Sequence, residues 1–125
     1  MKLNPGLMSC SWGNDQYQLV RIGTAAAIVG ERAVHICAGT DQEVADFFEN
    51  GCESENAGRR SRGTGADLLR VLREALRIAR AAGWDFIDGE PCSPDLIAPY
   101  RKIAKRFGAT EYKDEFGDIG FRLFL

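Results

Sequence analysis

The sequence has few of the residues that build metal centres. It contains one histidine, His35, and four cysteines that lie far apart and form no CxxC pair: Cys10, Cys37, Cys52 and Cys92. A tetrahedral zinc site needs Cys or His ligands at short spacings, so the sequence predicts no metal site. Scattered cysteines are typical of free thiols in a reducing compartment, which favours an intracellular protein.

Long apolar runs and a dominant charge are also missing. No segment is long enough to cross a bilayer, and the first residues, MKLNPGLMSCSWGN, show no signal-peptide pattern. We therefore expect a soluble cytoplasmic protein without a membrane partner. The formal net charge of -2 disfavours nucleic acid as the main partner.

The length and composition favour one domain. A chain of 125 residues that is 45% hydrophobic can bury a core without disulfides or metal. Residues 1–15 are rich in Gly, Pro and Asn, and we expect them to form an irregular N-terminal arm. The single domain should then cover residues 16–125. Alternation and β-branched residues predict three antiparallel strands with tight turns, at residues 16–22, 25–29 and 33–38.

Helical patterns dominate the middle of the chain. Apolar residues recur at helical spacing from Thr64 to Ala82, with arginines on the opposite face. A short helix is expected at 41–49, a strand at 84–87, a helix at 99–107 and a closing hairpin at 110–125. A strand that follows a helix after an earlier strand layer predicts at least one parallel pairing. The fold class is therefore α/β or α+β, with a mixed, mostly antiparallel sheet and flanking helices.

The segment Arg60–Ala66 (RSRGTGA) opens the long helix and points to an anion site. Its glycines allow close backbone approach, and free amides at a helix N-terminus favour an anion such as phosphate. Arginines at 59, 60 and 62 add positive charge. An ordinary helix start, a solvated arginine surface or a contact to a nucleic acid backbone would explain the same residues. A P-loop is excluded because no Lys-Ser/Thr pair follows the glycines.

The spacing Arg60-x-x-Gly63-x-Gly65 resembles the (Gln/Arg)-x-x-Gly-x-(Gly/Ala) motif of the GCN5-related N-acetyltransferases, the GNAT superfamily. Residues 103–109 (IAKRFGA) also resemble a stretch near the end of the next GNAT helix, and the likeness covers residues 16–125. It implies that the strand at 84–87 splays from its parallel neighbour to form a V. It also implies acetyl-coenzyme A as cofactor, with these cofactor-binding residues: Arg60, Arg62, Gly63, Thr64, Gly65 and Ala66.

Two of the chain's departures from the GNAT pattern concern the motif and the expected general acid. About twenty residues, including a helix, separate Ala38 from Arg60, where the family runs almost directly from strand to motif. The tyrosine that often serves as general acid would fall at Ala104, and Tyr100 stands one helical turn earlier on the same face.

The resemblance implies acetyl transfer from the thioester to an amine, whose identity stays open. Such a site must hold both reactants, accept a proton from the ammonium and protonate the leaving thiolate. The candidate bases are Glu31, His35 and Glu90, and the candidate acid is Tyr100, ahead of Tyr112. A strand histidine is also explained by a hydrogen-bonded place in the core.

A non-catalytic interaction protein is the alternative. The layout is similar to the small internal virion (core) proteins of T7-like phages in three stretches: Asp41–Val44, Phe107–Ala109 and Arg122–Leu125. That likeness implies protein partners in an assembly and a location in the virion. A nucleic-acid-binding module that uses the arginines near the long helix is a third reading.

Overall fold

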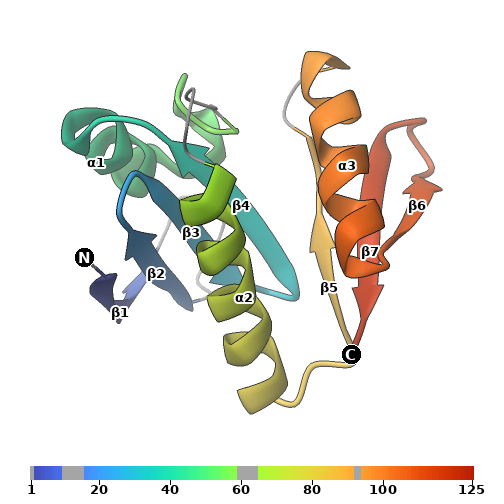
Figure 1. Ribbon diagram of the computed structural model, residues 1–125, viewed down its shortest axis with the longest axis horizontal. Coiled ribbons are helices and arrows are strands. Elements are labelled where there is room, and N and C mark those ends of the chain that lie inside the picture. Colours follow the sequence, from blue (N-terminus) through green and yellow to red (C-terminus); the bar gives the residue numbers. More distant parts are fainter. Residues whose placement is uncertain (1, 10–15, 59–64, 92–93) are drawn as a thin grey trace.

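The computed structural model describes residues 2–9, 16–58, 65–91 and 94–125. Within these residues, three α-helices and seven strands follow one another along the chain (Figure 1). They are β1 (Lys2–Ser9), β2 (Gln16–Ile22), β3 (Ala25–Gly30), β4 (Ala33–Ala38), α1 (Asp41–Asn50), α2 (Gly65–Ala81), β5 (Phe86–Gly89), α3 (Ile97–Phe107), β6 (Thr110–Lys113) and β7 (Ile119–Phe124). Short 3-10 turns lie at Gly51–Glu53 and Pro94–Leu96.

The described strands form one mixed sheet in the order β1-β2-β3-β4-β5-β7-β6. All neighbours are antiparallel except β4 and β5, which are parallel. The predicted mixed, mostly antiparallel sheet with a parallel pairing is therefore confirmed. The β7 strand inserts between β5 and β6, so the C-terminal hairpin extends the sheet from β5.

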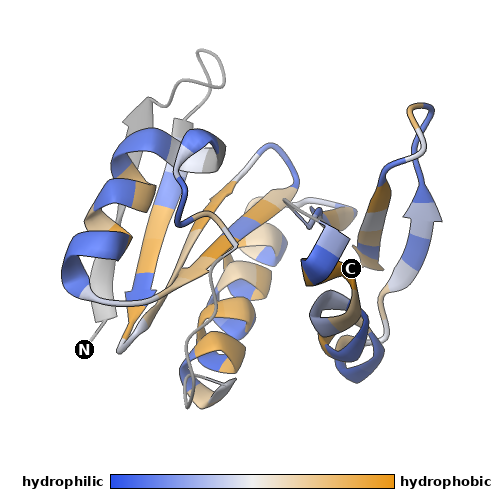
Figure 2. Cartoon of the chain, turned by 90° about the horizontal axis from the view of Figure 1, so that it is seen from above, coloured by the Kyte–Doolittle hydropathy of each residue, from blue (hydrophilic) through white to orange (hydrophobic). Residues whose placement is uncertain are grey.

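Helices cover both faces of the sheet. The larger core cluster joins the inner faces of α2 and α3 to strand residues such as Val20, Ile36 and Ile87. The smaller cluster packs Val44 and Phe47 of α1 against Ile28 on the opposite face. Seen from above, α1 lies on one side of the sheet while α2 and α3 lie on the other (Figure 2). Each helix is amphipathic, so the side that packs on the sheet is the apolar one.

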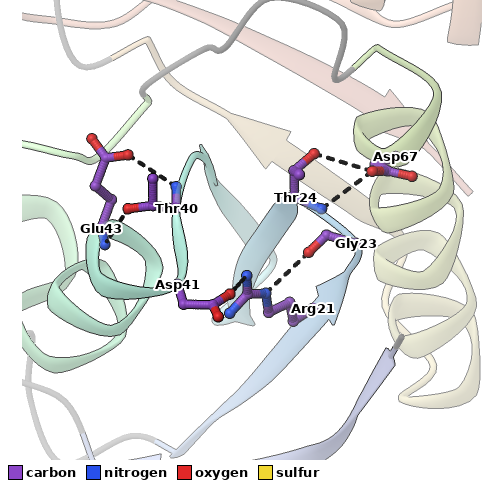
Figure 3. Close-up of polar contacts among 7 residues, drawn as sticks. All are labelled: Arg21, Gly23, Thr24, Thr40, Asp41, Glu43 and Asp67. Atoms are coloured by element: carbon purple, nitrogen blue, oxygen red, sulfur yellow. Dashed lines mark hydrogen bonds and ion pairs between the residues drawn. The ribbon is translucent and has the colours of Figure 1, made fainter.

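Local hydrogen bonds fix the start of α1. Thr40 is the N-cap, and its hydroxyl accepts a hydrogen bond from the Glu43 amide at 3.3 Å. The Glu43 carboxylate accepts one in return from the Thr40 amide at 2.9 Å, which completes a capping box (Figure 3). An ion pair from Arg21 on β2 to Asp41 also ties the first turn of the helix to the sheet.

Lys2–Ser9 differs from the expectation of an irregular arm, because this segment forms β1 at the edge of the sheet. Pairing with β2 overrides the low strand propensity of Pro and Gly. The register shifts between Leu3 and Gly6, so the stretch that contains Pro5 sits at an irregularity of an edge strand. Edges and bulges are the places where a sheet tolerates proline.

Candidate functional site

The candidate site begins where β4 and β5 separate. The two strands share one registered pair, Ala33 with Asp88, and the Asp88 amide donates to the Arg32 carbonyl at 2.7 Å. The β5 strand ends one residue later at Gly89, whereas β4 continues to Ala38. The sheet therefore opens between the C-terminal part of β4 and the chain beyond β5 (Figure 1).

An apolar cavity of about 90 Å³ fills this opening on the side of the sheet that carries α2 and α3. Both helices, the diverging strands and β7 form its walls. It is lined by Val34, Ile36, Leu72, Ala75, Leu76, Ile87, Asp88, Gly89, Tyr100, Ile103, Ala104, Phe107, Ala109, Phe121 and Leu123. Only Asp88 and Tyr100 among these carry polar side chains. Walls of this kind exclude water and suit an apolar ligand group.

Tyr100, the candidate acid, is brought to this cavity by α3. It is buried, with its ring centroid 6.2 Å from that of Phe121 on β7. Ala104, which takes the place of the expected tyrosine, lines the same cavity one turn along the helix. The helical spacing noted in the sequence therefore places both positions on the wall of one cavity.

His35 lies on the other face of the sheet. Side chains alternate along a strand, and its neighbours Val34 and Ile36 pack toward α2 and α3. Cys37, two residues on, packs with the α1 cluster, so the His35 side chain is on the α1 side. Burial lowers the pKa of His35 from 6.5 to about 4. The imidazole is therefore neutral at pH 7 and on the far side of the sheet from the cavity.

Glu31 is also turned away from the cavity. It forms the two-residue β3–β4 turn with Arg32, and both have positive φ, 50° and 62°. Its carboxylate accepts a hydrogen bond of 2.6 Å from the hydroxyl of Tyr17. Tyr17 is a buried member of the α1-side cluster. The structure therefore brings Glu31 to this cluster, and of the predicted catalytic residues Glu31, His35 and Tyr100 it places Tyr100 at the cavity.

A polar network stands on the sheet face opposite α3. Arg122 of β7 donates two hydrogen bonds to the Asp88 carboxylate, at 2.8 and 2.9 Å. Its guanidinium carbon lies over the Phe86 ring, 3.8 Å from the ring centroid. The Tyr112 hydroxyl lies 3.4 Å from Asp88 and 3.3 Å from Glu90. Burial and the two carboxylates raise the pKa of Tyr112 to about 12, so the phenol stays protonated at neutral pH.

The sequence reasoning gave no role to Asp88 or Arg122. The signal that reveals them is strand alternation. Ile87 and Phe121 face the helices, so the next residue on each strand faces the opposite side. The antiparallel register of β5 and β7 then places Asp88 opposite Arg122.

The chain itself occupies part of the open β4 edge. Carbonyl groups alternate between the two edges of a strand, so the Ile36 carbonyl points to the same edge as that of Arg32, which bonds β5. The Ile36 carbonyl accepts a hydrogen bond of 2.6 Å from the amide of Gly58. The segment after α1 thus lies where β5 has left the edge.

Only part of the predicted cofactor-binding segment belongs to the described residues. Arg60, Arg62, Gly63 and Thr64 lie outside the described residues. Gly65 and Ala66 form the exposed start of α2. In the first turn, the Asp67 carboxylate accepts hydrogen bonds from the Thr24 amide and hydroxyl, at 3.2 and 3.1 Å (Figure 3). This contact fixes the N-terminal end of α2 against the β2–β3 turn.

The described part of the chain holds no group of three or more His, Cys, Asp or Glu residues arranged for a metal ion. None of the described helices is long and apolar enough to span a membrane. Comparisons of the chain with protein-family models, curated proteins and solved structures give no match.

Proposed function

We propose that the chain is a GNAT-type domain that binds acetyl-coenzyme A, with the acyl-bearing arm in the cavity between β4 and β5, and that it transfers the acetyl group to an amine. The observation that carries the proposal is the cavity itself. It opens at the parallel step of the sheet, between α2 and α3, and its walls are apolar apart from Tyr100, since the Asp88 carboxylate is bonded to Arg122 on the opposite face. The insertion of β7 between β5 and β6 adds support, because it puts the C-terminal hairpin next to the strand that the resemblance expects to splay.

Within this proposal the residues have distinct roles. The apolar walls keep water away from the thioester, and the Tyr100 hydroxyl supplies a proton to the leaving sulfur. The exposed start of α2 at Gly65 and Ala66 offers amides for the phosphates. His35 and Glu31 take no part in proton transfer, because both side chains lie on the α1 side. Glu90 follows cavity-lining Gly89, but its carboxylate contacts the Tyr112 hydroxyl at 3.3 Å on the face opposite α3, so none of the three candidate bases faces the cavity.

A non-catalytic interaction protein of the same fold is the second candidate. The placement of His35 and Glu31 favours it, because an enzyme needs a base that reaches the acceptor amine. The Gly58 amide on the β4 edge favours it too, since it takes a hydrogen-bonding position beside the cavity. Such a protein would act through partners in an assembly, as the likeness to phage core proteins implies, with the virion as its location.

The test is acetyl-coenzyme A binding by the wild type and two matched variants. Ala104→Leu extends a side chain into the cavity, and Ala98→Leu makes the same change at an exposed position of α3. Ligand at about 100 times its dissociation constant should stabilise the wild type by about 2.7 kcal/mol. We expect this thermal shift to be kept in Ala98→Leu and lost in Ala104→Leu. Equal shifts in both variants would place the ligand outside the cavity.

Tyr100→Phe separates the two candidates. In a transferase the variant keeps the thermal shift with acetyl-coenzyme A but loses most of the turnover with an amine acceptor, since general acid catalysis contributes roughly 10²–10⁴-fold. Thioester hydrolysis is followed as the background reaction. A wild type that gives no shift at millimolar ligand would reject the enzyme and favour the interaction protein.

A further inference from the structure

The segment Glu53–Gly58 is an ordered connection that closes onto the sheet. Its middle residues form a turn, in which the Ala57 amide donates to the Ser54 carbonyl at 3.1 Å. Ala57 then packs against the α1-side cluster, and Gly58 reaches the Ile36 carbonyl with a positive φ of 75°. We call this segment the strap.

Asp46 on α1 holds the strap by two side chains. Its Oδ2 accepts hydrogen bonds from the Ser54 hydroxyl at 2.5 Å and from the Asn56 amide group at 2.9 Å. These hydrogen bonds lower the pKa of Asp46, and the bond from Ser54 has the largest effect, followed by that from Asn56. The carboxylate is therefore ionised at neutral pH. Ser54 is only 8% exposed and also accepts from the Asn56 backbone amide at 3.0 Å. One carboxylate therefore organises the middle of the strap.

The far end of the strap occupies a hydrogen-bonding position on the β4 edge. An unpaired strand edge is a template for any extended chain that carries amide groups. The Gly58 amide satisfies the Ile36 carbonyl on the edge that β5 leaves, and Ile36 also lines the apolar cavity. A ligand arm with amide groups that lay along this edge of β4 would compete for the same carbonyl. The amide of Gly58 and an amide of the ligand arm cannot occupy the same place beside the Ile36 carbonyl.

We propose that the strap is an internal competitor for the β4 edge, latched by Asp46, and that its release increases the affinity of the cavity for an amide-containing acyl thioester. The proposal rests on the proposed function, because it concerns access to the same cavity. The form with the strap closed is then the low-affinity state. The observed dissociation constant equals that of the open form divided by the fraction of molecules in which the strap is open.

The test compares Asp46→Ala with Glu49→Ala, which removes the same charge from an exposed position of α1. Asn56→Ala serves as a milder release if Asp46→Ala is poorly folded, because it removes one of the two side-chain contacts. Two quantities are measured: hydrogen exchange of the Gly58 amide without ligand, and the dissociation constant for acetyl-coenzyme A by calorimetry. We expect Asp46→Ala to exchange Gly58 faster and to bind at least about fivefold more tightly, with Glu49→Ala like the wild type.

The outcomes separate the two proposals. If the wild type and Asp46→Ala bind equally while Gly58 exchange is faster, the cavity stands as a binding site and the competition is refuted. If Gly58 exchange is unchanged in both Asp46→Ala and Asn56→Ala, the latch is refuted whatever the affinity. If neither the wild type nor any strap-released variant binds acetyl-coenzyme A, the proposed function is refuted, and the proposed competition is refuted with it.

Discussion

The buried His35 gives a pH dependence of stability that can be calculated. Burial lowers its pKa from 6.5 to about 4 in the folded protein, so the unfolded chain takes up a proton at a higher pH than the folded one. The free energy of unfolding must then decrease as the pH falls from about 6.5 toward 4. At about 1.36 kcal/mol per pKa unit the full effect is about 3 kcal/mol, and about 2 kcal/mol of it is lost between pH 7.5 and pH 5.

His35 is the chain's only histidine, so the assignment is direct. Urea unfolding between pH 5 and pH 7.5 should show this decrease in the free energy of unfolding. In thermal unfolding the same decrease corresponds to a midpoint lower by roughly 6–10 °C. His35→Gln should abolish the dependence of stability on pH in this range. Carboxylates with lowered pKa values, such as Asp46 and Asp67, lose their contribution only at lower pH. An NMR titration of the imidazole gives the folded pKa independently. A folded pKa near 6.5 together with a flat stability profile would refute the placement of His35.

Two further predictions concern packing. Phe47→Ala should lower the free energy of unfolding by about 3–5 kcal/mol in chemical denaturation, since the ring is 0% exposed and anchors α1 to the sheet; a loss below 1 kcal/mol would contradict that packing. Gly23→Ala should lower the free energy of unfolding more than Gly83→Ala, because both glycines have positive φ but only at Gly23 would a Cβ collide with a neighbour, the Asp67 carboxylate. A side chain at positive φ costs about 1–2 kcal/mol at either position. Equal losses for the two variants would therefore argue against the contact with Asp67.

Much of the fold follows from local sequence signals. The strand Ala33–Ala38 has the predicted bounds, and the helix predicted at 64–82 runs from Gly65 to Ala81. The residue types before α1 allow either Thr40 or Asp41 as its N-cap, and the capping box with Glu43 in the structure decides for Thr40. The Lys2–Ser9 strand was not predictable, because its pairing with β2 is a tertiary effect that local propensity does not record.

The candidate site was less accessible to sequence reasoning. Helical spacing put Tyr100 and Ala104 on one face, and the structure places both at the cavity. The sequence could not decide which face of the sheet His35 takes, because that depends on the register of β4 with its neighbours. The contact from Gly58 to Ile36 joins residues far apart in sequence, so no local pattern announces it.

The most direct test of the account is to map acetyl-coenzyme A on the protein through its isoleucine methyl signals in NMR. Ile36, Ile87 and Ile103 line the cavity from β4, β5 and α3, whereas Ile28 belongs to the cluster on the opposite face. We predict that saturating ligand shifts the first three signals and leaves that of Ile28 in place. Unchanged cavity signals, or changes confined to the α1 side, would contradict the claim that the opening between β4 and β5 is a ligand site.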